Sequence, residues 1–389
     1  MQNTQNARNS QSQILSTGSA ESARSAGSAL YVVVPGDLET RTGGYGYDRR
    51  IISGLRALGW RVHVVQLDAS FPFPTAAARA DAGRALAAIP DGNLVLGDGL
   101  ALGVLPDDAA RHAARLTIVA LVHHPLAAET GLDASAAAAL EQSERRALAS
   151  VRAVVVTSRG TAGALARYGV GADRITVVEP GTDPAPLARG SGLRTPHSAL
   201  RNDDVVLLCV AAVTARKGHG LLIRALASMP NRNWRLTCAG GLDRDPSTVA
   251  RVRALVREVG LDDRVSLVGD MDAAQLALEY DRADLFVLPT LYEGYGMAVA
   301  EALARGLPVI STATGAISEL VGERAGIVVP PGDLPAFAGA LSRVLGDAGL
   351  RSLHAAGART VRERLPTWDA AAAAMAQALG RSGGTGMTR

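Results

Sequence analysis

The chain of 389 residues is too long for one ordinary hydrophobic core and fits two domains, because a domain typically holds about 150 residues. Apolar residues make up 48% and charged residues 20%, which excludes a chain that is disordered throughout. The 40 basic and 37 acidic residues leave a net charge of +3 without a basic run of the kind that binds nucleic acid, and no apolar stretch is long enough to span a membrane. We therefore expect a soluble cytoplasmic protein with no nucleic-acid partner and at most peripheral membrane contact.

Strand-like and helix-like segments alternate along the chain. In the first half, strands are expected at 30–34, 61–67, 94–96, 116–122, 151–157 and 174–178. In the second half, they are expected at 204–212, 234–239, 264–268, 285–288, 308–310 and 326–329. Such alternation predicts parallel strands with helical crossovers, and therefore an α/β protein of two doubly wound, Rossmann-like domains facing across a cleft. Ligands of such domains bind at the carboxyl ends of the strands.

Shifts in composition predict the domain boundaries. Low-complexity polar sequence at the start and a stretch rich in Gly, Pro, Ser and Thr in the middle indicate a tail and a linker. We expect a disordered tail at 1–28, a first domain at 29–180, a linker at 181–203, a second domain at 204–365, a helix at 366–380 and a disordered tail at 381–389. Whether that helix packs back on the first domain is left open.

Two cysteines and one lysine stand out by their rarity. Cys209 and Cys238 each lie in an apolar, strand-like run, which predicts reduced core residues and neither a disulfide nor a metal site. The basic residues are 39 arginines and one lysine, Lys217. Because an ammonium and a guanidinium interact differently with phosphate, this lysine is a candidate functional residue, with survival by chance as the alternative.

The most specific motif is the segment 289–306, PTLYEGYGMAVAEALARG. It predicts a strand end, a tight glycine loop and a helix that begins at Met297. The backbone N–H groups of Gly296 and Met297 would then form an anion site at a helix N-terminus. Glu293 before the helix and Glu301 inside it are placed to accept hydrogen bonds from hydroxyls on either side of a phosphate, one set from a sugar and one from a ribose. The alternative is a helix-capping glutamate and an exposed one.

A second motif, VTARKGH at 213–219, predicts the exit of a strand and the start of a helix. Arg216 and Lys217 are adjacent cations before Gly218 at the carboxyl end of that strand. They would form a clamp for a diphosphate. A solvated pair of surface charges is the alternative.

In these motifs and their order, residues 205–345 resemble the nucleotide-binding half of the retaining family 4 glycosyltransferases, of the glycogen-synthase-like and mannosyltransferase-like kind, which have the GT-B fold. The matching stretches run in chain order through 217–218, 238–241, 265–269, 283–289, 293–301, 306–309, 319–321 and 331–333. The first half is similar more loosely, through Gly43-Gly44, His123 and 180–183. The resemblance spans nearly all of 30–380, with its specificity concentrated in the second half.

The resemblance implies a metal-independent retaining glycosyltransferase without cofactors. It would move a hexose-type sugar from a nucleoside-diphosphate sugar, bound by the second domain, to an acceptor hydroxyl on the side of the first. Glu301 would bind the ribose and Glu293 the sugar, while Lys217 and the backbone of 294–297 hold the diphosphate and Gly44 closes from the other domain. The implied catalytic residues are Lys217, Arg216, Glu293 and His123, and the implied donor-binding residues are Gly44, Gly294, Tyr295, Gly296, Met297 and Glu301. The family usually has an arginine five residues before the lysine, where this chain has Ala212, and Arg216 is the obvious replacement.

The first domain offers weaker candidates. His123 and His124 follow an expected strand, where a pair of histidines is about as consistent with a functional role as with a structural one. By the resemblance, the imidazole and the backbone carbonyl of His123 face the sugar, and Glu129 is a candidate contact of the acceptor.

Other functions stay open. A GT-B nucleotide-sugar epimerase or phosphorylase would share the cleft, and a non-catalytic nucleotide-sugar-binding protein would keep the site without the reaction. A dinucleotide fingerprint at 42–46 is set aside because G-x-G-x-x-G is absent and the glycines are expected in a loop ahead of the helix. The pairs Asp243/Asp245 and Asp270/Asp272 are expected to cap turns or helices rather than to bind metal. The donor base, the sugar and the acceptor are not encoded in any readable motif.

Overall fold

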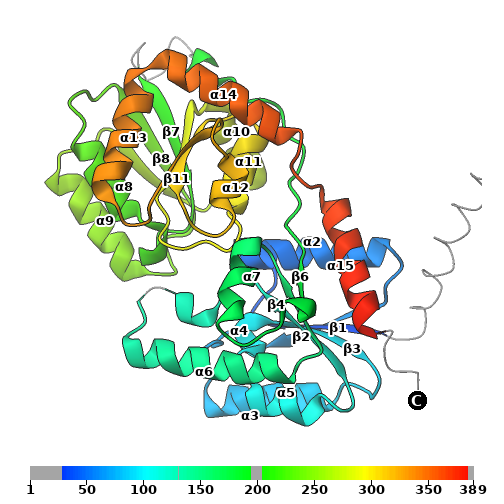
Figure 1. Cartoon of the computed structure of the whole chain (residues 1–389). Coiled ribbons are helices and arrows are strands. Elements are labelled where there is room, and N and C mark those ends of the chain that lie inside the picture. The colour runs from blue at the N-terminus through cyan, green and yellow to red at the C-terminus, as the bar shows by residue number, and fades with distance from the viewer. Residues whose placement is uncertain (1–28, 130, 194–203, 384–389) are drawn as a thin grey trace, which may run out of the picture.

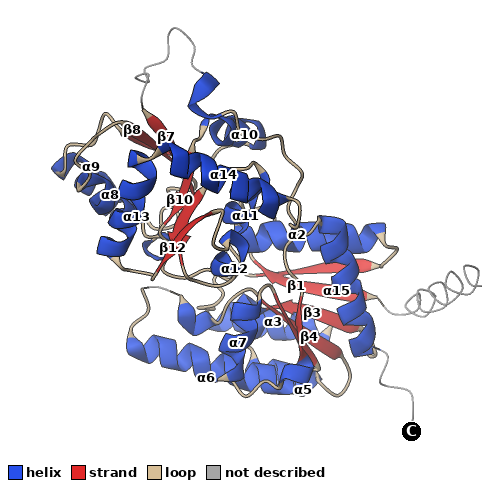
Figure 2. Ribbon diagram, turned by 45° about the horizontal axis from the view of Figure 1, so that its top comes forward, coloured by secondary structure: helices blue, strands red, loops and turns tan. Residues whose placement is uncertain are grey.

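The computed structural model describes residues 29–129, 131–193 and 204–383. They form two α/β domains, each built on a six-stranded parallel sheet with helices packed around it (Figure 1 and Figure 2). The expected class, two doubly wound Rossmann-like domains, is therefore confirmed. All of the expected strands are present in the described part of the chain, with ends within two residues of the expected ones.

The N-terminal sheet has the strand order β2-β1-β3-β4-β5-β6. Its strands are β1 Leu30–Pro35, β2 Val62–Leu67, β3 Leu94–Asp98, β4 Thr117–Val122, β5 Ala153–Val156 and β6 Ile175–Val177. Its helices are α2 Gly43–Ala57, α3 Ala76–Ala87, α4 Gly99–Leu102, α5 Pro106–His112, α6 Ala134–Ser150 and α7 Arg159–Ala166. Neighbouring strand residues such as Val32 and Val33 are buried in two different apolar clusters, because helices cover both faces of a parallel sheet.

The C-terminal sheet has the strand order β12-β11-β10-β7-β8-β9. Its strands are β7 Val205–Val210, β8 Trp234–Ala239, β9 Val265–Gly269, β10 Leu285–Leu288, β11 Val309–Thr312 and β12 Gly326–Val329. Its helices are α8 His219–Ala227, α9 Pro246–Glu258, α10 Ala273–Arg282, α11 Met297–Ala304, α12 Ile317–Val321, α13 Leu334–Gly346 and α14 Ala348–Arg362. A single large apolar cluster, with Trp234 and Phe286 fully buried, joins this sheet to its helices.

The last helix, α15 Trp368–Gly383, leaves the C-terminal domain and packs on α2 of the N-terminal domain (Figure 1). Met375 and Leu379 are buried in the same apolar cluster as β1 and α2, and Ala372 lies against Gly54. This answers the question that the sequence left open. The helix ends at Gly383, so 381–383 are helical instead of belonging to the tail that the sequence predicts there.

The two connections between the domains lie side by side. The N–H group of Thr182 donates a hydrogen bond of 2.8 Å to the carbonyl of Pro366, which leads into α15. The expected tails at 1–28 and 384–389 and the linker residues 194–203 lie outside the described residues.

The glycines at 43–46 do not form the loop that the sequence predicts. The sequence predicts a loop over Gly43 and Gly44, but both residues lie in the first turn of α2. Thr42 caps this turn, its hydroxyl accepting a 3.1 Å hydrogen bond from the N–H of Tyr45, so the helix begins earlier than its apolar pattern indicates. One reason for setting a dinucleotide fingerprint aside was therefore wrong, although G-x-G-x-x-G is still absent.

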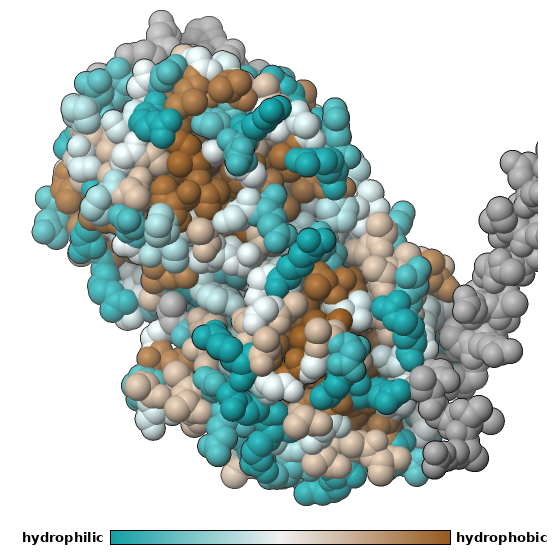
Figure 3. Space-filling model, in the orientation of Figure 1, coloured by the Kyte–Doolittle hydropathy of each residue, from teal (hydrophilic) through white to brown (hydrophobic). Residues whose placement is uncertain are grey.

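The exposed surface is mixed in character. On the face drawn in Figure 3, hydrophobic residues are interspersed with hydrophilic ones in both domains. In the described part of the chain, no helix has both the length and the apolar composition needed to cross a membrane.

Candidate active site

A cleft of about 880 Å³ lies between the two domains. Its walls come from the carboxyl ends of the strands: Gly36 follows β1, His123 follows β4, Ala211 follows β7 and Gly294 lies in the loop after β10. This is the position at which doubly wound domains bind ligands, and the volume suits a small molecule.

The residues that the sequence singles out as candidates all line this cleft. They are Lys217, Arg216, Glu293, His123, Gly44, Gly294, Tyr295, Gly296, Met297 and Glu301. The fold thus brings together residues from both domains, while the role of each stays a prediction.

Two helix N-termini face each other across the cleft. Helix α11 begins at Met297 after Gly296, whose φ of 99° places it in the left-handed region that favours glycine. No side chain of the residues that the structure describes caps this end, so its first N–H groups are available to a ligand. On the other side is the first turn of α2, where a Cβ atom on Gly43 would lie 3.9 Å from the sulfur of Met297. Together the two ends can stabilise an anion bound between them.

Glu301 lies in α11 at the edge of the cleft. Burial raises the pKa of its carboxyl, although a hydrogen bond of 3.0 Å from the hydroxyl of Tyr280 opposes the shift. Tyr280 is fully buried, and the guanidinium of Arg305 lies 4.3 Å from the centre of its ring. The sequence analysis missed Tyr280, which holds one carboxylate oxygen of Glu301 in a fixed position.

Lys217 and Glu293 form an ion pair in this structure. A second cation, Arg216, has its Nη1 at 3.9 Å from the same oxygen of Glu293. Burial raises the pKa of Glu293, but the charges of Lys217 and Arg216 outweigh it and hold the pKa below its ordinary value. Glu293 is therefore an ionised hydrogen-bond acceptor, and a ligand must exchange partners with Lys217 to reach it.

Arg216 connects the two domains. Its Nε lies 3.1 Å from Oε1 of Glu129 in the N-terminal domain, and its Nη1 donates a 2.8 Å hydrogen bond to the carbonyl of Tyr292. Glu129 also lies 3.5 Å from Nε2 of His124. Arg216 is thus already engaged by Glu129, and its role as the replacement for the arginine missing at Ala212 stays a prediction.

Two buried carboxylic acids lie behind His123, and the sequence analysis missed both. Asp48 of α2 and Asp98 at the end of β3 are 2% and 3% exposed, and Nε2 of His123 lies 3.3 Å from Oδ1 of Asp48. Burial lowers the pKa of His123, but the negative charges of Asp48 and Asp98 outweigh it and raise the pKa. Burial, followed by the charge of Asp48, raises the pKa of Asp98 to about 7. The group can therefore hold and release a proton near neutral pH.

The backbone carbonyl of His123 is held by the N-terminal domain. It accepts hydrogen bonds of 3.3 Å from the hydroxyls of both Thr157 and Thr161. It points at Gly294 of the other domain so closely that a Cβ atom on Gly294 would overlap it. The domains approach each other here through backbone, which only a glycine at position 294 allows.

One aspartate of each D-x-D pair caps a helix, as the sequence predicts. Asp245 accepts a 2.9 Å hydrogen bond from the N–H of Thr248 at the start of α9, and Asp272 forms a capping box with Gln275 at the start of α10. Between the first pair lies Arg244, which lines the cleft and has no hydrogen bond or ion pair with the described residues. It is a further cation available to an anionic ligand.

Comparison with known proteins agrees with this architecture. The family model described as Glycosyl transferases group 1 matches residues 204–347, and the model Glycosyltransferase Family 4 matches residues 102–186. A D-inositol 3-phosphate glycosyltransferase of Xylanimonas cellulosilytica is 35% identical over 242 residues, which cover 60% of this chain and 57% of the relative. The protein of the same name from Nocardia farcinica is 30% identical over 280 residues, 65% of this chain and 62% of the relative. The chain thus matches less than two thirds of the length of these relatives.

Solved structures share the fold over most of the chain. Sucrose-phosphate synthase from Thermosynechococcus elongatus has a TM-score of 0.76 at 24% identity and covers 90% of this chain and 98% of its own. Anabaena HepE, solved in complex with UDP and glucose, has a TM-score of 0.71 at 18% identity and covers 91% of this chain and 100% of its own. Glycosyltransferase family models thus match a part of each half of the chain, and its two sheets have the arrangement of the GT-B fold.

Proposed function

We propose that this protein is a retaining glycosyltransferase that moves a hexose-type sugar from a nucleoside-diphosphate sugar to an acceptor hydroxyl, without a metal ion. The observation that carries the proposal is the uncapped N-terminus of α11, flanked in one cleft by Glu293 and Glu301 and by the cation Lys217. This combination offers a phosphate site between two groups that accept hydrogen bonds from hydroxyls.

Donor binding would rearrange the ion pair at the centre of the site. The diphosphate takes over the ammonium of Lys217, and hydroxyls of the sugar donate to the carboxylate of Glu293 in its place. Glu301, already oriented by Tyr280, accepts hydrogen bonds from the ribose. As the bond between the anomeric carbon and the phosphate oxygen breaks, negative charge grows on the diphosphate. Lys217 and the N–H groups of α11 stabilise that charge.

The acceptor would attack on the face from which the diphosphate leaves. Its hydroxyl oxygen bonds to the anomeric carbon, and its proton passes to the leaving phosphate oxygen, so the reaction needs no carboxylate nucleophile. His123, backed by Asp48, lies on the opposite wall of the cleft and would orient the sugar.

Two of the comparisons guide the choice of substrates. UDP and glucose occupy HepE, and the curated relatives carry the name D-inositol 3-phosphate glycosyltransferase, so UDP-glucose with D-inositol 3-phosphate is the first pair to assay. A polyhydroxylated acceptor also suits a wall that carries Asp37, Asp98 and Glu129. We also propose that the protein acts in the cytoplasm, where it would encounter the donor.

The test is a thermal-unfolding series with UDP, GDP, ADP, TDP and NAD on the wild type and on Glu301→Ala. A ligand at about 100 times its Kd stabilises the folded state by about 2.7 kcal/mol, which raises the melting temperature measurably. We expect one diphosphate to stabilise the wild type, with a smaller effect in Glu301→Ala and an unchanged effect in Glu258→Ala, an exposed glutamate of α9 that does not line the cleft.

The competing functions give different results. The proposal would be contradicted if NAD alone stabilised the protein. It would also be contradicted if none of the nucleoside diphosphates stabilised it at millimolar concentration. An epimerase would convert the donor without any acceptor, and a non-catalytic binding protein would respond to the diphosphate without releasing it from a donor.

A further inference from the structure

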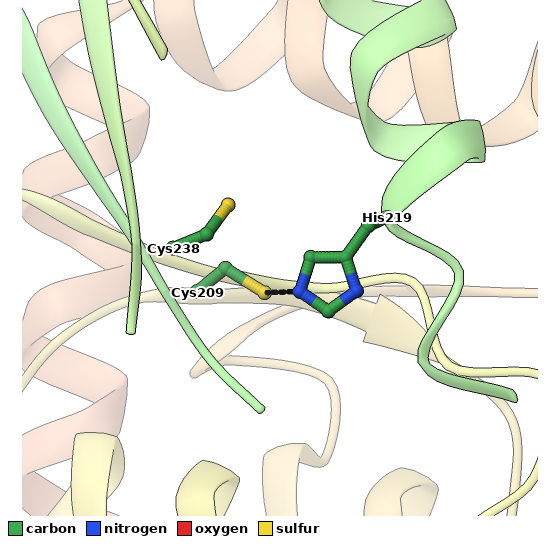
Figure 4. Close-up of side chains that lie close together, drawn as sticks. All are labelled: Cys209, His219 and Cys238. Carbon is green, nitrogen blue, oxygen red and sulfur yellow. Dashed lines mark hydrogen bonds between the residues drawn. The ribbon is translucent and has the colours of Figure 1, made fainter. Parts of the chain in front are cut away.

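Two cysteines and a histidine meet in the interior of the C-terminal domain (Figure 4). Cys209 of β7 and Cys238 of β8 are register partners on neighbouring parallel strands, so their side chains lie on the same face of the sheet. His219, the first residue of α8, points toward them from above that face. The two sulfur atoms and one imidazole nitrogen all lie within 4.8 Å of one another.

The three side chains are enclosed. Each is at most 1% exposed. The Sγ atom of Cys209 and the Nε2 atom of His219 are 3.8 Å apart, and the other ring nitrogen, Nδ1, has no hydrogen-bond partner in the described part of the chain. The Nε2 atom has a sulfur atom, a weak hydrogen-bond partner, and a stronger partner at Nε2 would make the burial of this imidazole less unfavourable.

The spacing suits coordination of one ion. With ordinary zinc–sulfur and zinc–nitrogen bond lengths, a sulfur–nitrogen separation of 3.8 Å corresponds to an angle of about 120° at the ion. That angle is the ideal one for trigonal coordination and about 10° wider than the tetrahedral one, so Cys209 and His219 need little movement to bind an ion. The strand pairing places Cys238 within reach of the same point.

The donor set selects the kind of ion. Two thiolates and one neutral imidazole are soft ligands that bind thiophilic ions such as Zn²⁺ and Cu⁺ and not the hard ions Mg²⁺ or Ca²⁺.

We propose that Cys209, His219 and Cys238 bind one thiophilic metal ion, for which Zn²⁺ is the probe, and that this ion ties β7, β8 and the start of α8 together. On binding, each thiol loses its proton to solvent, and two metal–sulfur bonds and one metal–nitrogen bond form. The ion lies within the core and takes no part in sugar transfer, so the proposal does not depend on the proposed function.

This inference departs from the expectation of two plain core cysteines and no metal. The ligands are separated by 9 and 18 residues in the chain, which is not a compact zinc motif. Strand pairing and the entry into α8 bring them together. Because Lys217 lies two residues before His219, an ion here would also fix the segment that carries the candidate diphosphate clamp.

The test measures metal binding by the whole chain without any nucleotide. The protein is kept reduced with a phosphine, stripped with a chelator and titrated with Zn²⁺ against a chromophoric competitor. We expect one equivalent with a Kd below about 1 µM, and at least about 100-fold weaker binding in Cys209→Val, Cys238→Val and His219→Gln. The matched control is His354→Gln, a buried histidine of α14, which should bind Zn²⁺ as the wild type does.

A second measurement keeps the proposal testable if a variant does not fold. Co²⁺ added to the stripped wild type should give the intense thiolate-to-cobalt absorption that carboxylate and histidine ligands cannot produce, and Zn²⁺ should abolish it. Absence of that absorption, or equally tight Zn²⁺ binding by folded Cys209→Val and Cys238→Val, would overturn the proposal.

Discussion

Replacing Gly294 with alanine tests how closely the two domains must approach for activity. The added Cβ would overlap the carbonyl oxygen of His123 and would lie 3.2 Å from its carbon and 3.5 Å from the hydroxyl of Thr157. The carbonyl cannot simply turn away, because the hydroxyls of Thr157 and Thr161 both donate to it. The strain must therefore be relieved by moving one domain from the other.

The expected cost follows from the size of that movement. To reach an ordinary contact distance, the Cβ and the carbonyl oxygen must separate by about 1 Å more. A misplacement of about 1 Å in a catalytic site lowers the rate by about 100-fold, or about 2.7 kcal/mol of transition-state stabilisation. Diphosphate binding should be retained, because Lys217, Glu301 and the N-terminus of α11 all belong to the C-terminal domain.

The assay compares the release of nucleoside diphosphate from the donor with the thermal shift caused by that diphosphate. Gly339→Ala is the control, since among the described residues no atom beyond its neighbours and its own helix backbone lies within 4 Å of the Cβ that it adds to α13. It should be fully active and more stable by about 0.5–1 kcal/mol, because alanine is favoured over glycine inside a helix. A wild-type kcat/KM in Gly294→Ala would refute the reasoning, and so would loss of the diphosphate shift.

Two further substitutions test individual groups. Lys217→Ala should lower donor turnover by about 100-fold or more, because a charged group that stabilises the leaving diphosphate contributes about 3 kcal/mol. Lys217→Arg should retain part of the rate. Near-wild-type turnover in Lys217→Ala would rule out the diphosphate clamp. Asp98 has a pKa of about 7 when folded against an ordinary 3.8, so the folded protein binds the extra proton and loses stability as the pH rises between those values. Asp98→Asn should therefore flatten the decline in melting temperature between about pH 4 and pH 7, and an unchanged slope would show that Asp98 does not cause that decline.

The sequence was sufficient for the strands and for the wall of the cleft that α11 forms. In a parallel sheet covered on both faces, each strand is a short apolar run, which the sequence displays directly. Glu293 and Glu301 belong to one contiguous motif, so their common location at α11 could be predicted from spacing alone.

The missed groups are those that the fold assembles from distant segments. Asp48, Asp98 and His123 come from a helix and two strand ends, and no local pattern links them. The ion pair of Arg216 with Glu129 joins residues 87 positions apart in different domains. The sequence analysis missed the early start of α2 because two adjacent glycines are typical of a loop. In the structure, the Thr42 cap stabilises a first turn that begins at Gly43.

The return of α15 to the N-terminal domain has a consequence for the order of folding. Met375, Ala378 and Leu379 share one apolar cluster with residues of β1 and α2, so that cluster is incomplete until the last described helix has been synthesised. The C-terminal domain encloses its own core from residues 205 to 361 and can close first. The N-terminal domain can therefore complete its core only after a helix some 300 residues further along the chain has been made, when the C-terminal domain can already have closed.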